Sequence, residues 1–226
     1  MKSRKNQSST NMKFLIALPL IIIALISLLI IVNKESQKPG SDMASHPSIE
    51  NQPTIGEADA PVSIVEFGDF LCPACKSWGE YIYPELKKDY IDKGLVKLSY
   101  VNVLFHGEES ILASLAAEVV YKNDPQAYWD FHKKLFSEQP VEHVGQWVTI
   151  EKILEVAEAT TNIDLQQLEN DLIEKSTMDE VDIDDKLVKE YKVEMTPSVI
   201  INGVMMDNPM DYGEIKKLIE QQLEDN

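Results

Sequence analysis

The chain has two cysteines, Cys72 and Cys75, separated by Pro73 and Ala74 in the stretch FGDFLCPACKSWGE (residues 67–80). An apolar segment precedes the pair and a segment that can form a helix follows it. The unpaired N–H groups and the positive dipole end at a helix start stabilise a thiolate, which lowers the pKa of the first cysteine below about 8.5. The second cysteine, one turn further in, would be shielded. This arrangement predicts thiol-disulfide exchange, with Cys72 as the nucleophile and Cys75 as the resolving thiol.

The same stabilisation indicates a direction for the exchange. A stabilised Cys72 thiolate favours the dithiol form, which makes the disulfide form a strong oxidant of other proteins. Two rivals stay open: a protein disulfide reductase or isomerase, and a chaperone or metal carrier that uses the same groove without redox turnover. A reduction potential near about −270 mV would favour reduction, and one well above about −180 mV would favour oxidation.

Two structural roles for the cysteine pair are less consistent with the sequence. A disulfide across two intervening residues closes a very short loop and gives little entropic stabilisation. A zinc site needs four ligands, of which the pair supplies two. The four histidines show no ligand spacing with it; they are His46, His106, His132 and His143. We therefore expect a redox pair with neither a bound metal nor a bound cofactor.

Composition and charge exclude one class of partner. The chain has 226 residues, of which 44% are hydrophobic, so it can build a core without disulfide staples. Residues 1–55 carry six Lys/Arg and three Asp/Glu, whereas residues 56–226 carry 15 and 35. Such an acidic body repels phosphate, so nucleic acid is not expected as a partner.

The N-terminus predicts a membrane anchor. The apolar run of residues 14–32 would form a helix about 28 Å long, close to the hydrocarbon thickness of a bilayer. Four basic residues precede it, which places residues 1–13 in the cytoplasm and the rest outside, as a single-pass protein of the cell membrane. No small-x-small cleavage site follows directly, so an uncleaved anchor is favoured; cleavage further along, near Ala44, is the alternative. Residues 33–55, rich in polar residues and proline, are expected to be a flexible linker.

The first half of the remaining chain predicts a βαβ unit. Residues 61–70 have the pattern of a buried strand, and residues 95–105 have that of a second one. Residues 76–88 between them can form a helix, which Pro84 would kink or break. The cysteine pair therefore lies between a strand and a helix.

The second half predicts a block of helices followed by a hairpin. Helical spacing recurs over residues 110–123, 126–139, 149–161, 164–176 and 180–191, with Thr149 and Asp164 as helix starts. Residues 197–203 form a short β-rich run that ends in Asn202-Gly203, a hairpin signal, and a final helix follows over residues 211–223, with Asp211 as its cap. The expected fold class is α/β: a thioredoxin fold over residues 56–226 with a helical insertion at about residues 108–190, preceded by one N-terminal transmembrane helix.

Three separated stretches resemble one known family. They are ADAPVSIVEFGDFLCPACKSW (58–78), LAAEVVYKNDPQAYWDFHKKLF (115–136) and VEMTPSVIINGVMM (193–206). In this order they resemble the DsbA-like thiol-disulfide oxidoreductases, in particular the membrane-anchored BdbD type of Gram-positive bacteria. The resemblance covers about residues 56–222. It implies that the protein oxidises newly exported proteins and is reoxidised by a quinone-linked membrane partner of the DsbB/BdbC type.

The resemblance also implies roles for residues away from the cysteines. Thr196-Pro197 would be a cis peptide bond facing the cysteine pair, with the Thr196 backbone free to pair with a substrate strand. Glu66, in the strand before the cysteines, would have a raised pKa if buried and would relay a proton to or from the inner thiol. Two departures stand out: Tyr100 falls near the place of the lysine found in periplasmic members, and Ala74 replaces their histidine. We expect a less acidic Cys72 and a milder oxidant.

Some remaining features have simpler explanations. The acidic run of Asp179, Glu180, Asp182, Asp184 and Asp185 lacks the glycine and closing glutamate of a calcium loop, so a solvated helix face is expected. Aromatic residues of the stretch 126–139 are expected in the helix core; they are Trp129, Phe131 and Phe136. We expect His132 to have its hydrogen bonds satisfied within that packing, or alternatively to border the active-site groove.

Overall fold

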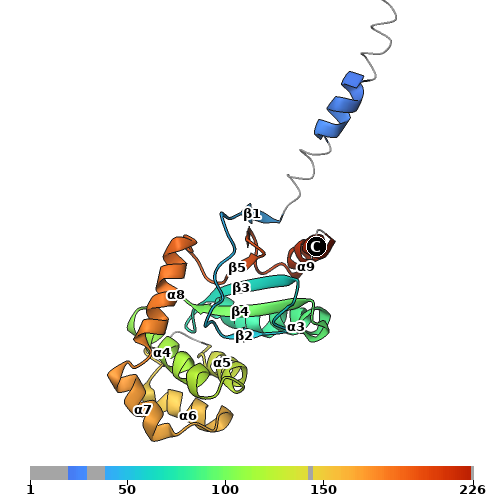
Figure 1. Ribbon diagram of the computed structural model, residues 1–226. Helices are drawn as coiled ribbons and strands as arrows, with labels where there is room; N and C mark the ends of the chain where they lie inside the picture. The colour runs from blue at the N-terminus through green and yellow to red at the C-terminus, as the bar shows by residue number, and fades with distance from the viewer. Residues whose placement is uncertain (1–19, 30–38, 142–144, 225–226) are drawn as a thin grey trace, which may run out of the picture. The chain divides into compact units, whose positions relative to one another are not determined.

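The computed structural model describes residues 20–29, 39–141 and 145–224 (Figure 1). The chain divides into two units, residues 1–38 and residues 39–226, of which the second holds the cysteines. Residues 20–29 are helical and their large apolar side chains are exposed. Within the described residues, no helix is both long enough and apolar enough to cross a membrane. The expected span over residues 14–32 extends beyond the described helix at both ends, so the anchor stays a prediction.

A six-stranded mixed sheet forms the centre of the second unit, with strand order β1-β6-β5-β3-β4-β2. The neighbouring strands β3 (Val62–Gly68) and β4 (Val96–Asn102) run parallel, which confirms the predicted βαβ unit. Strands β5 (Ser198–Ile201) and β6 (Val204–Met206) form an antiparallel hairpin. Asn202 and Gly203 both have positive φ at its turn, as an Asn-Gly hairpin requires.

The helical connection between β3 and β4 is interrupted, as predicted from Pro84. It consists of α2 (Pro73–Ser77), a π-helical turn η1 (Trp78–Ile82) and α3 (Tyr83–Asp89), followed by the short 3₁₀ turn η2 (Ile91–Lys93). The N–H of Tyr83 donates to the carbonyl of Trp78, five residues earlier. The wider turn precedes Pro84, which has no N–H to give. The helix begins at Pro73, directly after Cys72, and thus three residues earlier than the expected start at Lys76.

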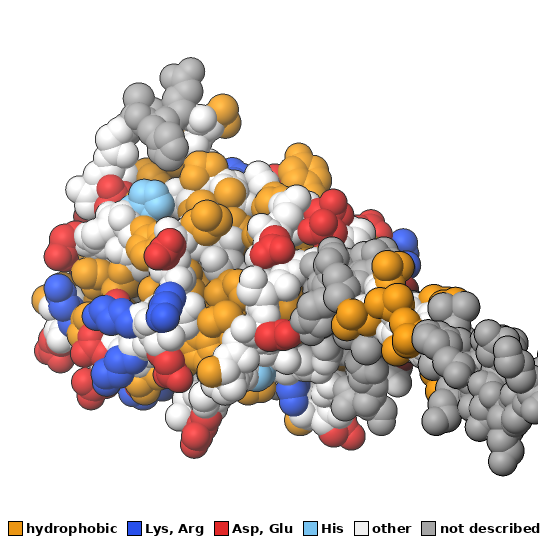
Figure 2. Space-filling view, turned by 90° about the horizontal axis from the view of Figure 1, so that it is seen from above, with side chains coloured by type: hydrophobic (Ala, Val, Ile, Leu, Met, Phe, Trp, Pro, Cys, Tyr) orange, Lys and Arg blue, Asp and Glu red, His pale blue; other side chains and the backbone are white. Residues whose placement is uncertain are grey.

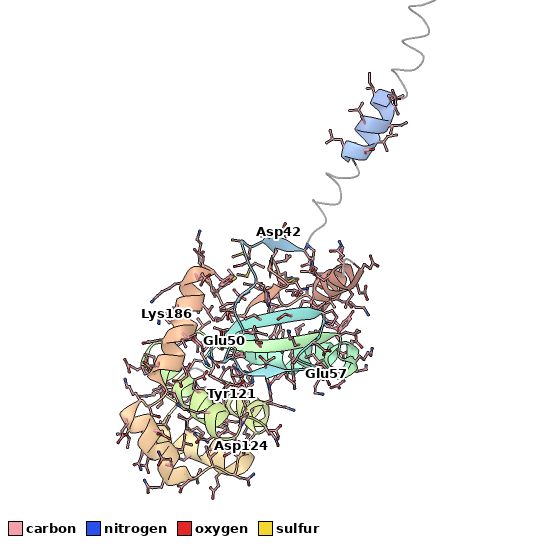
Figure 3. The ribbon with its side chains drawn as sticks, viewed as in Figure 1. Asp42, Glu50, Glu57, Tyr121, Asp124 and Lys186 are labelled. Atoms are coloured by element: carbon pink, nitrogen blue, oxygen red, sulfur yellow. The ribbon has the colours of Figure 1, made fainter. Side chains whose placement is uncertain are left out.

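The prediction of a flexible linker is wrong for residues 39–55. Strand β1 (Gly40–Asp42) pairs with β6, and β2 (Thr54–Ile55) pairs with β4, so this segment covers both edges of the sheet (Figure 1; Asp42 is labelled in Figure 3). His46 fixes the middle of the segment, because its ring contacts the Ser63 hydroxyl at 2.9 Å. Strands of two or three residues are too short to show a hydrophobic period, and covering edges is itself a tertiary property.

Among the described residues between β4 and β5 there are five helices and no strand, which agrees with the predicted helical block. Their bounds are α4 (Glu108–Asn123), α5 (Tyr128–Ser137), α6 (Ile150–Thr160), α7 (Leu165–Glu174) and α8 (Met178–Glu190). The predicted caps are confirmed: the Thr149 side chain accepts from the N–H of Lys152, and Asp164 accepts from the N–H groups of the two residues 166 and 167. Helices α4 to α7 gather together, while α8 lies beside the sheet (Figure 1). The last described element is α9 (Tyr212–Glu224), which Asp211 caps by accepting from the N–H of Glu214.

Alternation along β3 divides the core. Val62 and Ile64 pack with α3 and α9 on one face of the sheet. Val65 and Phe67 pack with α8 on the other face. A third cluster lies in the helical insertion and includes both cysteines. The cysteine pair therefore lies where the sheet meets the insertion.

Candidate active site

Asp69 fixes the loop that joins β3 to the cysteine pair. Its side chain is buried and accepts hydrogen bonds from the N–H of Leu71 (2.9 Å) and the N–H of Phe105 (3.0 Å). The ring of His106 and the hydroxyl of Ser110 contact the same carboxylate. Sequence analysis missed this residue, although an Asp that bonds the N–H two residues on is a common turn device. Asp69 connects the active-site loop to the start of the helical insertion.

Cys72 lies at the start of α2 and is the more acidic of the two thiols. Both cysteines are free thiols. The pKa of Cys72 is lowered to about 5, chiefly by a hydrogen bond from Cys75, with further bonds from the Thr196 side chain and from the backbone N–H groups of Cys75 and Ala74. Burial opposes this shift. The predicted stabilisation of a thiolate by the helix start is therefore present, and the absence of a histidine at Ala74 does not prevent it.

Cys75 has the opposite character. Its side chain is 1% exposed, and burial raises its pKa far above the usual range. The hydrogen bond that it gives to Cys72 and the negative charges of Glu66 and Cys72 raise the pKa further. One sulfur is therefore poised as a thiolate, whereas its neighbour holds its proton.

The loop before β5 lies against the first sulfur. The Thr196-Pro197 peptide bond is cis, as the resemblance implied. The thiol of Cys72 donates to the carbonyl oxygen of Thr196 at 3.3 Å, across 124 positions of sequence. Pro197 is buried and Pro73 exposed, while Thr196 and Ala74 are half-buried. The structure thus brings all four of these residues together around the cysteine pair.

Glu66 lies beneath the cysteines, in the middle of β3. It is 3% exposed, and burial raises its pKa well above the usual value, with a further contribution from the charge of Cys72. The alternative, a partly exposed strand end, is wrong. Its register partner on β4 is Tyr100, which confirms that a tyrosine stands beside it.

The end of α5 holds the active-site segment from the insertion side. Gln139 donates from its side chain to the carbonyl of Phe70 (2.8 Å). Lys76, the residue after Cys75, reaches back and donates to the carbonyl of Gln139 (3.1 Å). These two bonds join the insertion to both sides of the cysteine pair, and neither was predicted from the sequence.

His132 differs from its expected state. The ring is enclosed by aromatic side chains, among them Phe70 (5.3 Å between ring centroids) and Tyr100 (4.5 Å). Burial lowers its pKa to about 3, and its Nε2 has no hydrogen-bond partner within the described residues. The prediction of satisfied hydrogen bonds is wrong at Nε2, because the helical face that carries His132 packs on aromatic rings and no polar atom of the described residues bonds to Nε2. Phe131 and Phe136 are core residues as predicted, and Trp129 packs partly buried beside them.

The acidic run on α8 is not wholly solvated. Asp184 is fully buried and accepts from the side chain of Gln52 (2.7 Å) and from the backbone and side-chain N–H groups of Asn102 (2.9 and 2.7 Å). Asn102 also donates to Glu118 (2.9 Å), which is buried on α4. The solvated-face prediction is wrong at Asp184, because the four-residue period turns that one carboxylate toward the sheet. Figure 3 labels Tyr121 on α4, whose hydroxyl donates to the carbonyl of Gln52 (3.2 Å).

The chemistry of the site rests on its two sulfurs. Within the described part of the chain, no three His, Cys, Asp or Glu side chains are grouped so that they could hold a metal ion. Figure 2 shows acidic, basic and apolar side chains interspersed over the face that it displays. The geometry supports thiol-disulfide exchange between Cys72 and an incoming sulfur.

Comparison with known proteins gives a consistent family. A family model described as thioredoxin matches residues 48–221. Disulfide bond formation protein D of Bacillus subtilis (strain 168) is 42% identical over 191 residues, which cover 84% of this chain and 86% of that protein. Probable disulfide bond formation protein D of Bacillus anthracis is 37% identical over 224 residues, with 99% of each chain covered.

Solved structures agree. The crystal structure of oxidised BdbD from Bacillus subtilis matches with a TM-score of 0.79 and 43% identity, over 81% of this chain and 99% of that one. The DsbA of Chlamydia trachomatis shares the fold, with a TM-score of 0.69 at 22% identity over 79% of this chain and 93% of that chain. The chain therefore belongs to the thioredoxin-like disulfide bond formation proteins, and it is a DsbA-type thiol-disulfide oxidoreductase.

Proposed function

We propose that this oxidoreductase introduces disulfide bonds into exported proteins through Cys72 and Cys75. The observation that carries the proposal is the contrast between the two sulfurs: the pKa of Cys72 is lowered to about 5, whereas that of Cys75 is raised. A stabilised Cys72 thiolate favours the dithiol form of the enzyme, so its disulfide form oxidises other thiols. The same contrast makes Cys72 the better leaving group and Cys75 the sulfur that needs a proton.

The exchange then runs in two displacements. A substrate thiolate attacks the Cys72 sulfur, the Cys72–Cys75 bond breaks, and the electron pair leaves on Cys75. A second substrate thiolate attacks the substrate sulfur of the mixed disulfide, and Cys72 leaves as a thiolate. Two substrate thiols become one disulfide, and the two enzyme cysteines are reduced. We propose that Glu66, neutral because its pKa is raised, protonates the buried Cys75 sulfur and later regains a proton from solvent.

Thr196 and Pro197 are proposed to hold the substrate chain beside Cys72. The Thr196 carbonyl already lies 3.3 Å from the Cys72 sulfur, so a peptide that pairs with this backbone would bring its own cysteine to the same place. Two exposed apolar side chains belong to segments that reach the site: Met195, the residue before Thr196, is 66% exposed, and Phe105, whose N–H donates to Asp69, is 48% exposed. They would contact apolar side chains of an unfolded substrate.

Turnover needs an oxidant, and we propose a quinone-linked membrane thiol oxidase of the DsbB/BdbC type for that step. The oxidase would accept two electrons from the Cys72–Cys75 dithiol and restore its disulfide. We also propose that the N-terminal segment anchors the catalytic unit outside the cell membrane, which agrees with the basic residues before the apolar run. Protease treatment of intact cells tests this, because digestion of the catalytic unit without lysis is expected only if it lies outside.

Transfer assays with single-cysteine variants test the mechanism. Cys72→Ala should abolish oxidation of a reduced secreted protein. Cys75→Ala, mixed instead with the disulfide form of that protein, should accumulate a mixed disulfide through Cys72, because no second thiol of the enzyme displaces the substrate; mass spectrometry detects it. Transfer at the wild-type rate by either variant would rule the mechanism out. A reduction potential near about −270 mV would instead support a reductase, and absence of any exchange would support a non-redox carrier.

A further inference from the structure

Tyr100 is a buried tyrosine whose hydroxyl has no role in the steps above. Its side chain is fully buried, and no described protein group pairs with its hydroxyl. Buried tyrosine hydroxyls usually have a partner, because an unpaired polar group in the core costs stability. A residue that is kept in this state beside an active site is a candidate for a functional role.

Its position places the Tyr100 side chain beside the proposed proton donor. Tyr100 is the register partner of Glu66 on parallel neighbouring strands, so the two side chains leave the sheet on the same face. A methyl group added at Gly68 would lie 2.6 Å from the Tyr100 hydroxyl oxygen. The Tyr100 ring therefore points along the sheet from Glu66 toward Gly68, which is the end of β3 that leads to Cys72. Cys75 belongs to the same core cluster as Tyr100.

Aromatic side chains hold the Tyr100 ring in place, and the histidine among them carries no positive charge. Phe70 and His132 pack on the Tyr100 ring, at 5.7 and 4.5 Å between centroids. Burial lowers the pKa of His132 to about 3, so its ring is neutral at physiological pH. Burial raises the pKa of Tyr100 well above its usual value, and the charges of Cys75 and Glu66 raise it further. Tyr100 therefore keeps its proton and can act only as a hydrogen-bond partner.

We propose that Tyr100 is a positioning residue for the proton transfer: its hydroxyl donates a hydrogen bond to the Glu66 carboxylate formed when Glu66 protonates Cys75. This inference rests on the proposed roles of Cys75 and Glu66. In that step the O–H bond of Glu66 breaks and the S–H bond of Cys75 forms. The negative charge moves from the sulfur to the carboxylate, and no electron leaves the pair.

A donor in this place lowers the energy of the charged state selectively. While Glu66 is neutral, the hydroxyl contributes little; once the carboxylate forms in the dry core, the bond becomes charge-assisted and stronger. An interaction that is stronger after the charge develops speeds the step that creates it. The unpaired hydroxyl lowers the stability of the resting protein, whereas during exchange it stabilises the newly formed carboxylate.

Tyr100→Phe removes this hydroxyl and keeps the ring. The rate at which the oxidised full-length protein oxidises a reduced peptide should fall about 10-fold or more. Thermal stability should stay equal or rise, because an unpaired buried hydroxyl is lost, and the reduction potential should stay unchanged because both end states hold neutral Glu66. Tyr128→Phe is the matched control: Tyr128 is equally buried and its hydroxyl is also unpaired within the described residues, but the charges that act on it most strongly are Glu118 and Asp184. Its rate should equal that of the wild type.

A double variant tests whether Tyr100 acts through Glu66. Adding Tyr100→Phe to Glu66→Gln should cause no further loss of rate, because the carboxylate that Tyr100 serves is gone. A full second loss in the double variant, an equal loss in Tyr128→Phe, or a wild-type rate in Tyr100→Phe would each overturn the inference. A wild-type protein that does not oxidise the peptide would overturn the proposed function itself, which separates the two failures.

Discussion

Two buried acidic sites lie beside β4, one at Tyr100 and the other at Asn102. They differ in the number of hydrogen bonds that stabilise the ionised carboxylate. Glu66 lies beside Tyr100 beneath the cysteines, and its pKa is raised well above the usual value by burial and by the charge of Cys72. Asp184 accepts from Gln52 and twice from Asn102, and its pKa is raised only to about 6 by burial, which those bonds oppose. Burial is similar at the two sites, whereas the N–H donors are present at one of them.

The comparison shows what N–H donors do for a buried carboxylate. Glu118 has its pKa raised to about 8 by burial and by the charges of Asp184 and Glu180, and the one bond that it accepts from Asn102 opposes this shift. Donors favour the ionised form, and their scarcity keeps the proton on the acid. A carboxyl that must hand a proton to a sulfur is best kept protonated, which is the state at Glu66. The cluster around Asp184 is built to hold elements together: it joins Gln52 of the N-terminal segment and β4 to α8.

The largest expected effect concerns the ionisation of the two sulfurs. In the reduced protein, alkylation of Cys72 should follow a titration with a midpoint near pH 5, whereas Cys75 should stay unreactive at neutral pH. At pH 7 Cys72 should therefore react as a nearly complete thiolate. Iodoacetamide labelling across pH, read by mass spectrometry of the separate peptides, measures this. Two midpoints near that of free cysteine, about 8.5, would contradict the contrast on which the function rests.

The next effect separates the two acidic clusters by activity. Glu66→Gln should slow oxidation of a reduced peptide about 10-fold or more, because Gln cannot supply a proton. Glu118→Gln, which changes a buried glutamate in the same way but away from the cysteines, should leave the rate unchanged. Stopped-flow measurement of the exchange gives both rates. Equal slowing by the two variants would show that replacing any buried glutamate slows the reaction, whether or not it lies beside Cys75.

The same Glu118→Gln variant should also change how the free energy of unfolding depends on pH. Since the pKa of Glu118 is about 8 in the folded protein, above its ordinary value of 4.5, the folded state binds its proton more tightly. Folding stability should therefore fall as pH rises from about 4.5 through about 8, by on the order of 5 kcal/mol. Glu118→Gln should flatten this dependence. Urea unfolding at several pH values, in buffer with a chelator so that no cation offsets the charge, checks it.

Exposed Glu80→Gln serves as the control for that series. It should keep the wild-type slope of stability against pH, since an exposed carboxyl gains little from folding. A slope that is unchanged in Glu118→Gln as well would mean that Glu118 does not bind the additional proton.

The smallest effect tests the space that Tyr100 occupies. An added Cβ at Gly68 would lie 2.6–2.9 Å from the Tyr100 ring and hydroxyl, which neighbours hold in place, so Gly68→Ala should destabilise the protein by about 2 kcal/mol. Gly79→Ala, where nothing lies within 4 Å of the added Cβ, should be neutral or stabilising by about 0.5 kcal/mol. Thermal unfolding compares the two. Destabilisation by both variants to the same extent would rule out crowding against Tyr100 as the cause.

Much of the fold could be predicted because its signals are local. Thr149 and Asp164 mark helix starts through bonds that span two or three residues, and Asn202-Gly203 marks its hairpin within two. The short strands of residues 39–55 could not be predicted, since their composition is that of a linker and their pairing partners lie far along the chain. His132 was misjudged for the same reason, because its neighbours from other elements decide whether its ring finds a partner.

The sequence by itself determined the chemistry. Two sulfurs with two residues between them follow a strand and lie at the start of a helix, and local geometry is enough to establish this. The tertiary structure alone decided that both sulfurs are buried, that Thr196 reaches Cys72 across 124 positions, and that Asp184 turns inward while its neighbours face solvent. The physical reason is that burial and charge–charge contact depend on elements brought together by folding, whereas caps and turns depend on bonds within a few residues.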